Sequence, residues 1–512
     1  MISCLPWRCG VTVAGILAVA AVLAAGACSR PTGRAAEQAT AQHADGGGHD
    51  WPMFGGTPER NMVNASARNI PTDWAVKNGK HKNIKWAADL GKTSYGGPTV
   101  AGGRVFVGTN NERPRNPKVK GDKGVLMCFR ESDGRFLWQA VHDKLPGARD
   151  NDYPEQGIAS TPLVEGNRLY YVSNRCELVC ADTSGDGKEE ARIIWRLDMM
   201  KDLNVFPLYL ANCSPLAAGD LVFVITGNGR DEAHTLPSPE APSFIAVHKK
   251  AGKLAWKSSL PGKNILDGQW SNPAYAVVNG KPQIIFAGGD GWLYGLDPKT
   301  GEVIWKFDCN AKSSKYKPGG GGERNYIMAT PVVYDNKVYV GVGRDPGNES
   351  AGPGGFWCVD ITKTGDLSPV GDNFDPKAAV NKKSGLVWHY GGPTKGGERD
   401  YLFCRTLSTC AVYDGLVYVA DLDGFVYCFD AKTGKKFWEE DLKSAVWGSP
   451  LWVDGKVYLG SDDGTVTIFA AGKEKKVLAK VDMDEPVQST PVVANGVLYV
   501  MTRSRLYAIE TK

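Results

Sequence analysis

The sequence predicts an all-β protein, an eight-bladed β-propeller of four-stranded antiparallel blades. Two repeats lead to this prediction, because self-similarity along a chain indicates a repeat architecture. A strand-opening motif recurs around Pro98, Pro162, Pro215, Pro273, Pro331, Pro450 and Pro491, with an eighth copy at Cys410. An apolar strand follows each opening, at 126–129, 178–181, 244–247, 293–296, 356–359, 426–429, 466–469 and 506–509.

Residues 447–466 are the clearest copy and show how a blade is built. Pro450 begins a strand, because proline cannot donate to a β-ladder and therefore lies at the first residue of a strand or on an edge. Asp454-Gly455 turns the chain, Val457-Tyr458-Leu459 runs back, and a second turn ends at Gly464 before the third strand. Glycine supplies the positive φ that such hairpin turns require.

A fourth strand that carries a tryptophan follows the third strand in most copies. We expect each of these side chains to pack between neighbouring blades, where burial of an aromatic ring contributes about 2–3 kcal/mol. The structural tryptophans are Trp86, Trp138, Trp195, Trp256, Trp305, Trp388 and Trp438.

The last blade ends near Lys512 without a fourth strand, whereas a spare one stands upstream, from Ile84 to Leu90. This N-terminal strand is therefore predicted to complete the C-terminal blade and close the ring. Closure protects strand edges that would otherwise template aggregation.

The N-terminus predicts export. Residues 1–27 have a positive Arg8 and an apolar run too short for a transmembrane helix, which needs about 20 residues, and they read as a signal peptide. Ala25-Gly26-Ala27-Cys28 resembles a bacterial lipoprotein signal, in which Cys28 is acylated; plain secretory cleavage at the same bond is the alternative. We expect a periplasmic or outer-membrane protein, anchored by a lipid on Cys28.

Three segments follow the signal peptide. Residues 28–50 are polar and Gly-rich and are predicted to form a flexible tether. Residues 51–83 form a lead-in segment, and residues 84–512 form the propeller. The net charge is +4 with both signs mixed along the chain, so no nucleic acid is expected as a partner.

The cysteines do not indicate a haem site. No C-x-x-C-H motif occurs, which excludes covalent c-type haem on this signature. Nine cysteines remain beyond Cys28. Four of them lie in third strands and are predicted to be small buried apolar residues: Cys128, Cys180, Cys358 and Cys428.

The blade sequence resembles that of a known family. Ser-x-Pro, Val-Tyr-Val-Gly, Asp-Gly-x-Leu-Tyr-x-Leu-Asp and Thr-Gly-x-x-x-Trp, spread over about 84–512, look like the repeat of quinoprotein-like, PQQ-type propellers. Residues 51–56 resemble the lead-in found ahead of such propellers. The superfamily includes quinone-dependent alcohol dehydrogenases and the lipoprotein scaffold of the outer-membrane β-barrel assembly machinery. Fold alone does not decide between these functions.

The resemblance implies two functional hypotheses. The dehydrogenases place adjacent cysteines against the quinone and need Ca²⁺ and an Asp base, whereas this sequence has no Cys-Cys pair. The first hypothesis is therefore a monomeric, non-catalytic scaffold that binds a protein partner in the envelope, without catalytic residues, cofactor or metal. The alternative is a PQQ-dependent oxidoreductase, with Ca²⁺, or a ligand sensor that uses the central funnel.

Candidate binding residues lie in long loops between a fourth strand and the next opening, which share one rim of the ring. Residues 322–326 and 397–401 are near copies, and 149–153 is a looser relative. The Arg, Glu and aromatic side chains of these loops could form a polar funnel with stacking platforms. Alternatively, they pair with one another and hold the loops in place across the channel. The candidates are Arg149, Tyr153, Trp270, Glu323, Arg324, Tyr326, Glu398, Arg399, Tyr401 and Trp447.

Overall fold

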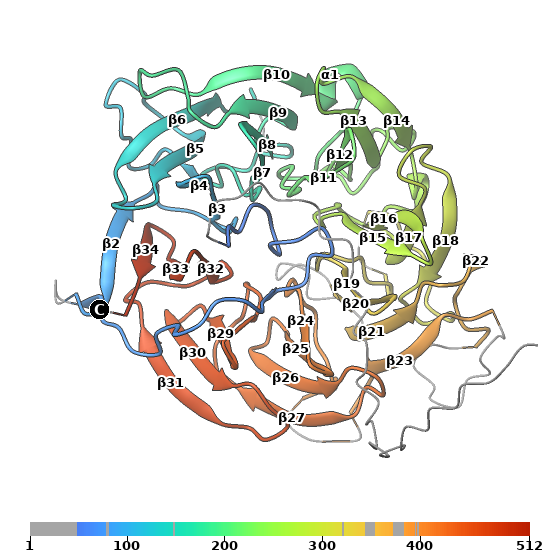
Figure 1. Cartoon of the computed structure of the whole chain (residues 1–512). Helices are drawn as coiled ribbons and strands as arrows, with labels where there is room; N and C mark the ends of the chain where they lie inside the picture. Colours follow the sequence, from blue (N-terminus) through green and yellow to red (C-terminus); the bar gives the residue numbers. More distant parts are fainter. Residues whose placement is uncertain are drawn as a thin grey trace, which may run out of the picture. The chain divides into compact units, whose positions relative to one another are not determined.

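The computed structural model describes residues 49–511, except 78–80, 147–148, 320–321, 344–353, 372–382, 395 and 397–398. In this part of the chain eight β-sheets surround a central axis, so the predicted all-β, eight-bladed fold is confirmed (Figure 1). The described helices are α1 (Met199–Leu203) and a 3-10 helix, Gly262–Asn264. The predicted signal peptide, Cys28 and nearly all of the predicted tether lie outside the described residues.

Each blade runs from a short strand at the axis to a longer strand at the circumference, and blades are numbered here from the sheet that begins with β3. Blades 1 to 4 consist of β3 (Thr99–Ala101), β4 (Arg104–Asn110), β5 (Lys123–Arg130) and β6 (Phe136–Asp143); β7 (Leu163–Glu165), β8 (Arg168–Val172), β9 (Glu177–Asp182) and β10 (Arg192–Asp198); β11 (Leu216–Ala218), β12 (Leu221–Ile225), β13 (Phe244–His248) and β14 (Leu254–Ser258); β15 (Ala274–Val278), β16 (Lys281–Ala287), β17 (Trp292–Leu296) and β18 (Val303–Asp308).

Blades 5 to 8 continue the same pattern. They consist of β19 (Val332–Tyr334), β20 (Lys337–Val342), β21 (Gly355–Asp360) and β23 (Leu386–Gly391); β24 (Ala411–Tyr413), β25 (Leu416–Ala420), β26 (Phe425–Asp430) and β27 (Lys436–Asp441); β28 (Leu451–Val453), β29 (Lys456–Gly460), β30 (Thr465–Ala470) and β31 (Val477–Asp482); β32 (Val492–Ala494), β33 (Val497–Met501), β34 (Arg505–Ile509) and β2 (Ile84–Asp89).

The ring closes as the sequence predicts. Strand β2, from the N-terminal part of the chain, pairs antiparallel with β34 near the C-terminus, with Ala87 opposite Tyr507 (Figure 1). Two further short strands add to blades in parallel: β1 (Val63–Asn64) beside β28, and β22 (Gly365–Asp366) beside β18.

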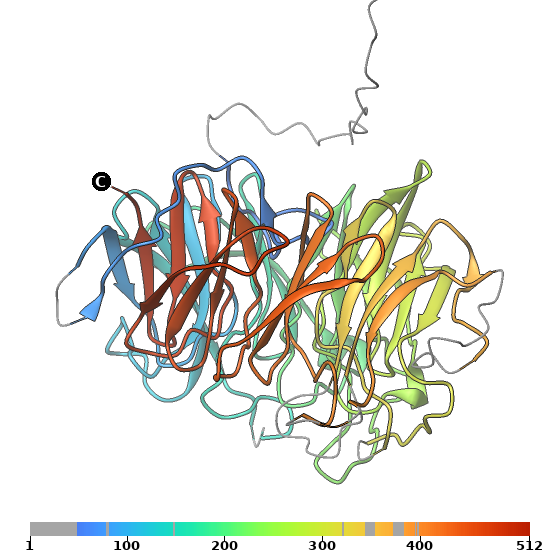
Figure 2. The ribbon, with the colours of Figure 1, turned by 90° about the horizontal axis from the view of Figure 1, so that it is seen from below.

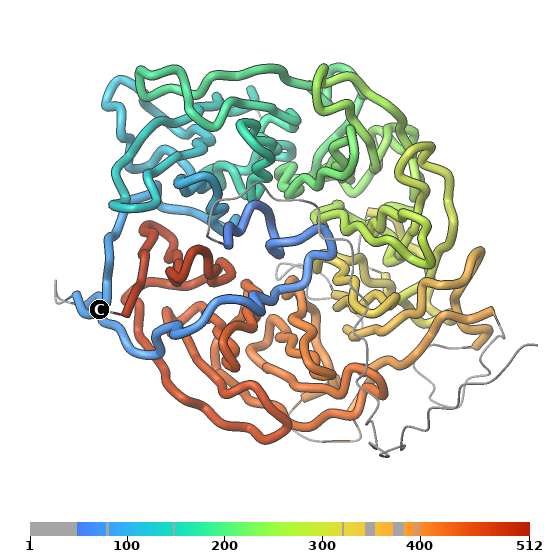
Figure 3. Tube along the Cα trace, viewed as in Figure 1, coloured from blue at the N-terminus to red at the C-terminus, as the bar shows by residue number. Residues whose placement is uncertain are grey.

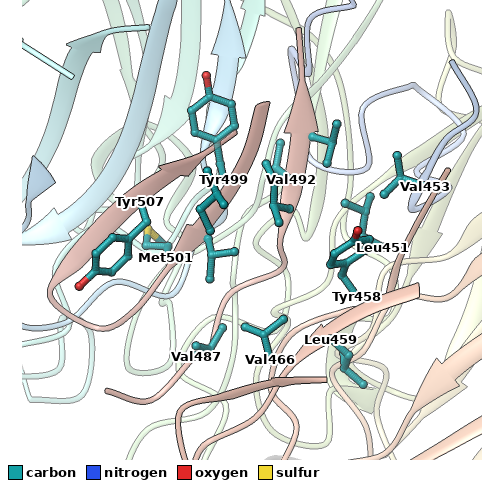
Figure 4. Packing of buried hydrophobic residues seen from close by; sticks show 14 of the residues in the cluster. Leu451, Val453, Tyr458, Leu459, Val466, Val487, Val492, Tyr499, Met501 and Tyr507 are labelled. Atoms are coloured by element: carbon teal, nitrogen blue, oxygen red, sulfur yellow. The ribbon is translucent and has the colours of Figure 1, made fainter. Parts of the chain in front are cut away.

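The core lies between adjacent blades, whose faces pack against each other through buried apolar side chains. Figure 4 shows one such region, where Tyr458, Val492 and Met501 come from neighbouring blades. The nine cysteines beyond position 49 are all buried free thiols, including the four predicted in third strands.

A β-bulge precedes the tryptophan position of the outer strand in every blade. In blade 1, Cys128 pairs with Trp138 while Phe129 pairs with Phe136, so Leu137 is the extra residue. A bulge of this kind re-aims the side chain that follows it. It turns the indole toward the next blade.

Six of the seven structural tryptophans contact the following blade in the same way. The Trp86 indole N–H donates to the Glu131 carbonyl at 2.8 Å, and Trp138, Trp195, Trp256, Trp388 and Trp438 make the equivalent bond. In five of these contacts the ring covers a glycine of the partner turn, such as Gly134, whose added Cβ would lie 2.6 Å from Trp86.

Trp305 differs from the other six. Its indole N–H donates to the Gln283 side chain of its own blade at 2.7 Å, and its ring lies against Gly295. The long connection that follows β21 supplies β22, which pairs with Trp305 along the outer edge of β18. In blade 5 this long connection therefore replaces the short turn that accepts the indole hydrogen bond in six other blades.

Residues 49–64 form what we call the strap, which lies on the turn face, the face formed by the connections between first and second and between third and fourth strands (Figure 2). The strap hydrogen-bonds with every blade in turn. Its partners in blades 1 to 8 are Val100, Val164, Ser214, Tyr275, Val333, Val412, Trp452 and Val493.

Arg60 is the centre of the strap. Its side chain is fully buried, and four backbone carbonyls accept its hydrogen bonds at 2.8–3.0 Å: Phe54, Ser214, Pro215 and Pro273. Burial lowers the pKa of Arg60 to about 10, which leaves the guanidinium charged at neutral pH. The charge is therefore satisfied by carbonyl dipoles from blades 3 and 4 and from the strap itself.

We expect the indole–glycine contact to stabilise the interface between blades. Gly134→Ala places a methyl group against Trp86, and overpacking of this kind costs about 1–3 kcal/mol. Gly103→Ala is the matched control, because Gly103 has nearly the same positive φ, 72° against 71°, and nothing within 4 Å of an added Cβ. Urea unfolding should show Gly134→Ala to be the less stable variant by about 2 kcal/mol. Equal stability of the two variants would contradict the contact.

Candidate functional site: an axial pocket

The loop face lies opposite the turn face and carries the connections from each outer strand to the next blade (Figure 2). These connections end at the strand-opening motif, so the eight openings meet around the axis. The residue just before the opening proline, or before Cys410, occupies one level of this ring.

A chain of hydrogen bonds, which we call the girdle, links the openings from blade 2 to blade 8. The Thr161 backbone N–H donates to the Ser214 hydroxyl, and the Ser214 N–H donates to the Asn272 side chain. The chain continues in the same sense through Thr330, Thr409, Ser449 and Thr490, with distances of 2.5–3.3 Å along its length. Blade 1 has Gly97 at this level, which has no side chain to accept.

The residue two positions before each girdle position lines the mouth of a pocket on the axis. These eight mouth residues are Tyr95, Ala159, Asn212, Trp270, Met328, Leu407, Trp447 and Gln488. The pocket has a volume of about 140 Å³, and Phe54 of the strap also lines it. Because the strap crosses the axis on the turn face, Phe54 is the pocket's floor and the mouth lies on the loop face.

Uncharged side chains form the pocket. Among the described residues that line it, none is Asp, Glu, Lys or Arg. Charged groups contact the lining residues only from behind. The Arg60 guanidinium donates to the Ser214 carbonyl at 3.0 Å, and the Gln488 amide donates to Asp462 at 2.6 Å and accepts from Arg503 at 3.1 Å. Asp462 and Arg503 also lie 3.9 Å apart, so their charges offset each other.

Of the ten rim candidates, Trp270 and Trp447 line the pocket. The Trp270 indole N–H donates to the Leu208 carbonyl at 3.2 Å, and its ring packs edge-on against Tyr326, whose hydroxyl donates to Asp267. Trp447 is half-buried, with its ring centre 6.2 Å from that of Tyr95.

The other rim candidates lie away from the axial pocket and pair locally. Arg149 is exposed, forms an ion pair with Glu232 at 3.2 Å and lies over Tyr153. Glu323 is exposed and Tyr401 is half-buried. Glu398 lies outside the described residues.

The two related loops place their arginines against different blades, Arg324 against Asp308 of blade 4 and Arg399 against Tyr427 of blade 6. Arg324 is buried, pairs with Asp308 at 2.6 Å and covers the Tyr316 ring at 4.1 Å. Arg399 donates to the Tyr427 hydroxyl at 2.9 Å and covers the Phe425 ring at 3.8 Å. Each arginine thus holds its loop against a neighbouring strand, through residues outside the candidate set.

A buried Asp–Tyr pair occurs in each of the same two blades. The Tyr294 hydroxyl donates to Asp290 at 2.6 Å, and the Tyr427 hydroxyl donates to Asp421 at 2.7 Å. Burial raises the pKa of Asp290 and of Asp421 to about 6, although the tyrosine hydrogen bond opposes this shift.

A larger hollow of about 640 Å³ lies at the circumference between blades 1 and 2. Residues of both charge signs line it, among them Arg115, Lys188, Glu190 and Arg196. Part of its wall is the 183–191 turn, which pairs in parallel with Gln139 on the outer edge of blade 1. The hollow therefore lies along the outer edge of blade 1, which the 183–191 turn already covers.

The fold is that of an eight-bladed β-propeller, and comparison with known proteins identifies the family. A family model described as outer membrane protein assembly factor BamB matches residues 122–367 and 378–512. The chain therefore belongs to this family of PQQ-type repeat propellers, which confirms the resemblance inferred from the repeat.

Individual relatives are distant and of several kinds. The BamB of Moranella endobia is 20% identical over 402 residues, which cover 74% of this chain and 88% of that protein. The dehydrogenase subunit of the quinone-type alcohol dehydrogenase from Gluconobacter oxydans is 24% identical over 55% of this chain. The chain spans 38% of that subunit and 33% of a polyvinylalcohol dehydrogenase from a Sphingopyxis species, which is 25% identical over 43% of the chain.

Two solved structures share the fold. BamB from Moraxella catarrhalis superposes with a TM-score of 0.56 at 15% identity, covering 83% of this chain and 98% of that one. A europium-containing methanol dehydrogenase gives a TM-score of 0.60 at 13% identity, covering 90% and 98%. At these identities the likeness concerns the fold.

The axial pocket does not fit PQQ, the group that the dehydrogenase relatives imply. PQQ has three carboxylates on three fused rings, and a buried anion needs a paired cation or metal. The lining supplies uncharged groups, and its volume resembles that of a cavity of about 150 Å³ that holds a single benzene ring. Within the described ranges, no group of three or more His, Cys, Asp or Glu side chains could hold a metal ion.

Sequence reasoning missed six of the eight mouth residues. The sequence indicated Trp270 and Trp447, because an aromatic residue in a long loop can serve as a stacking platform. The other six have no common residue type, and only their position, two residues before the girdle, could have identified them.

The two buried aspartates give the protein a pH dependence. Because the folded pKa of about 6 lies above the ordinary 3.8, the folded state keeps protons that the unfolded chain has lost over this range. This contribution to stability is fully present below pH 3.8 and is lost as the pH rises through 6. Between about pH 4 and pH 7 the wild type should lose free energy of unfolding as these two carboxyl groups lose their protons. In the double variant Asp290→Asn with Asp421→Asn, urea unfolding should show this loss to be smaller by at least about 1 kcal/mol per site. Asp414→Asn, at an exposed turn, is the control and should keep the wild-type profile; an unchanged profile in the double variant would refute the assignment.

Proposed function

We propose that this protein is an envelope scaffold, held to a membrane by a lipid on Cys28, whose loop face binds a protein partner. One observation supports this orientation above all: the described chain begins on the turn face. The His49 carbonyl accepts from the Asn495 N–H at 3.1 Å, and the Asp50 carboxylate accepts from the Gly102 N–H at 3.0 Å. An anchor upstream of residue 49 would leave the loop face directed away from the membrane.

Two further observations support a binding role. The family match names an outer-membrane assembly factor, and BamB relatives cover most of their own length in the alignment. Among the described residues, no helix has the length and apolar character needed to cross a bilayer. The axial pocket does not fit the quinone of the dehydrogenase relatives, so the oxidoreductase alternative gains no support from it.

The anchor is tested by Cys28→Ser. We expect the variant to move from the membrane to the soluble envelope fraction, because the acyl chains would supply the membrane affinity. Fractionation with antibody detection measures this shift. If Cys28→Ser stays in the membrane fraction, the lipid assignment is wrong.

The partner-binding face is tested by photo-crosslinking in intact cells. A crosslinking residue at exposed loop-face positions, Arg149 or Glu323, should capture a protein, with outer-membrane barrel proteins as the expected class. The matched controls are Lys299 and Lys432, exposed residues in turns of the opposite face. Protein adducts from the turn-face positions alone would reverse the proposed orientation, and adducts from none of the four would contradict a protein partner.

A further inference from the structure

The mouth of the axial pocket varies from blade to blade while its supporting girdle does not. Girdle positions carry Ser, Thr or Asn in seven blades, whereas the mouth positions range from Ala159 to Trp447. Different side chains at the mouth, on a nearly uniform support, make the pocket wall asymmetric, which suits selection of a ligand. This holds whether or not the loop face also binds a protein.

The charge of the pocket limits the ligand. An anionic ligand would find no cation among the described lining residues, and a cationic ligand would find no carboxylate. Removing a charge from water is unfavourable unless it is paired. The ligand that fits is therefore neutral.

The polar groups of the pocket require a ligand that forms hydrogen bonds. The amide oxygen of Asn212 is buried and has no hydrogen-bond partner among the described residues. Buried acceptors in this state are rare and call for a water or ligand donor. The hydroxyls of Thr330, Ser449 and Thr490 accept in the girdle, and a hydroxyl that accepts still has an O–H to donate. A purely apolar ligand would leave these groups unsatisfied.

Aromatic rings supply the remaining surface. Tyr95 and Trp447 form one wall, on either side of Gln488, and Trp270 belongs to blade 4, which is opposite blade 8 in an eight-membered ring. The cavity of about 140 Å³ has room for about one six-membered ring. A ring with apolar C–H faces and hydroxyl edges matches both the aromatic walls and the amide and hydroxyl groups.

We propose that the axial pocket binds one ring of a neutral sugar, with the pyranose face against the Trp447–Tyr95 wall and its hydroxyls hydrogen-bonded to Asn212 and the girdle. Phe54 of the strap closes the far end, so the sugar enters and leaves from the loop face. This makes the terminal unit of a glycan, or a free monosaccharide, the expected class of ligand.

Binding is tested on the purified full chain with D-glucose, D-galactose and N-acetyl-D-glucosamine, each titrated to about 100 mM, well above the millimolar affinity expected for one small ring. Saturation-transfer NMR and tryptophan fluorescence report binding. We expect saturable binding of at least one of these sugars, and D-glucuronate, which has the same ring with a carboxylate, should bind at least tenfold more weakly. No saturable signal from any of the three sugars, or equal binding of D-glucuronate, would overturn the proposal.

Two variants test the location. Trp447→Ala should weaken binding at least tenfold, and Ala159→Trp, which fills the mouth without removing a group, should do the same. Trp292→Ala is the control, because Trp292 is also half-buried but lies outside the pocket. Urea unfolding verifies that each variant folds. Wild-type affinity in both folded mouth variants would place the sugar elsewhere and refute the proposal, whether or not the protein-scaffold proposal holds.

Discussion

Eight inner strand edges converge on one axis, and the backbone groups along them must find hydrogen-bond partners. Each innermost strand pairs with its own blade on one side and faces the axis on the other, where an unpaired edge is a liability. The strap pairs with these edges near the turn face, and the girdle links the strand openings near the loop face. The small polar residue before the opening therefore has a physical role in blades 3 to 8, since its side chain accepts a hydrogen bond from the preceding blade.

Most of the fold could be predicted from sequence because the repeat encodes it locally. The opening motif, the hairpin turns and the outer tryptophan recur from blade to blade. The missing last strand pointed to the stretch from Ile84 to Leu90, where the structure has β2 (Ile84–Asp89). Trp305 could not be predicted, because its geometry depends on β22, which arrives from the next blade through a long insertion. The strap escaped prediction for the same reason, since its partners are distant along the chain.

The candidate site was harder to predict, for two reasons. Conspicuous motifs such as 322–326 and 397–401 suggested binding, yet Arg324 and Arg399 hold loops in place through local partners. The pocket instead uses inconspicuous residues such as Asn212 and Leu407, which share a position but no chemistry. One ring fold can serve unrelated functions, as the outer-membrane assembly factors and the quinone-dependent dehydrogenases among the relatives illustrate.

The strap also imposes an order of events on biosynthesis. A ribosome makes residues 49–64 before any of the blades, yet their partners extend to Val493 in the last blade, so this early segment is the last to be fully paired. Contacts between such distant parts of a chain form slowly. A prematurely terminated polypeptide lacks Trp452 and Val493, so the Met62 carbonyl and the Asn64 amide of its strap have no partners there. Full pairing of the strap thus requires that the last two blades are present.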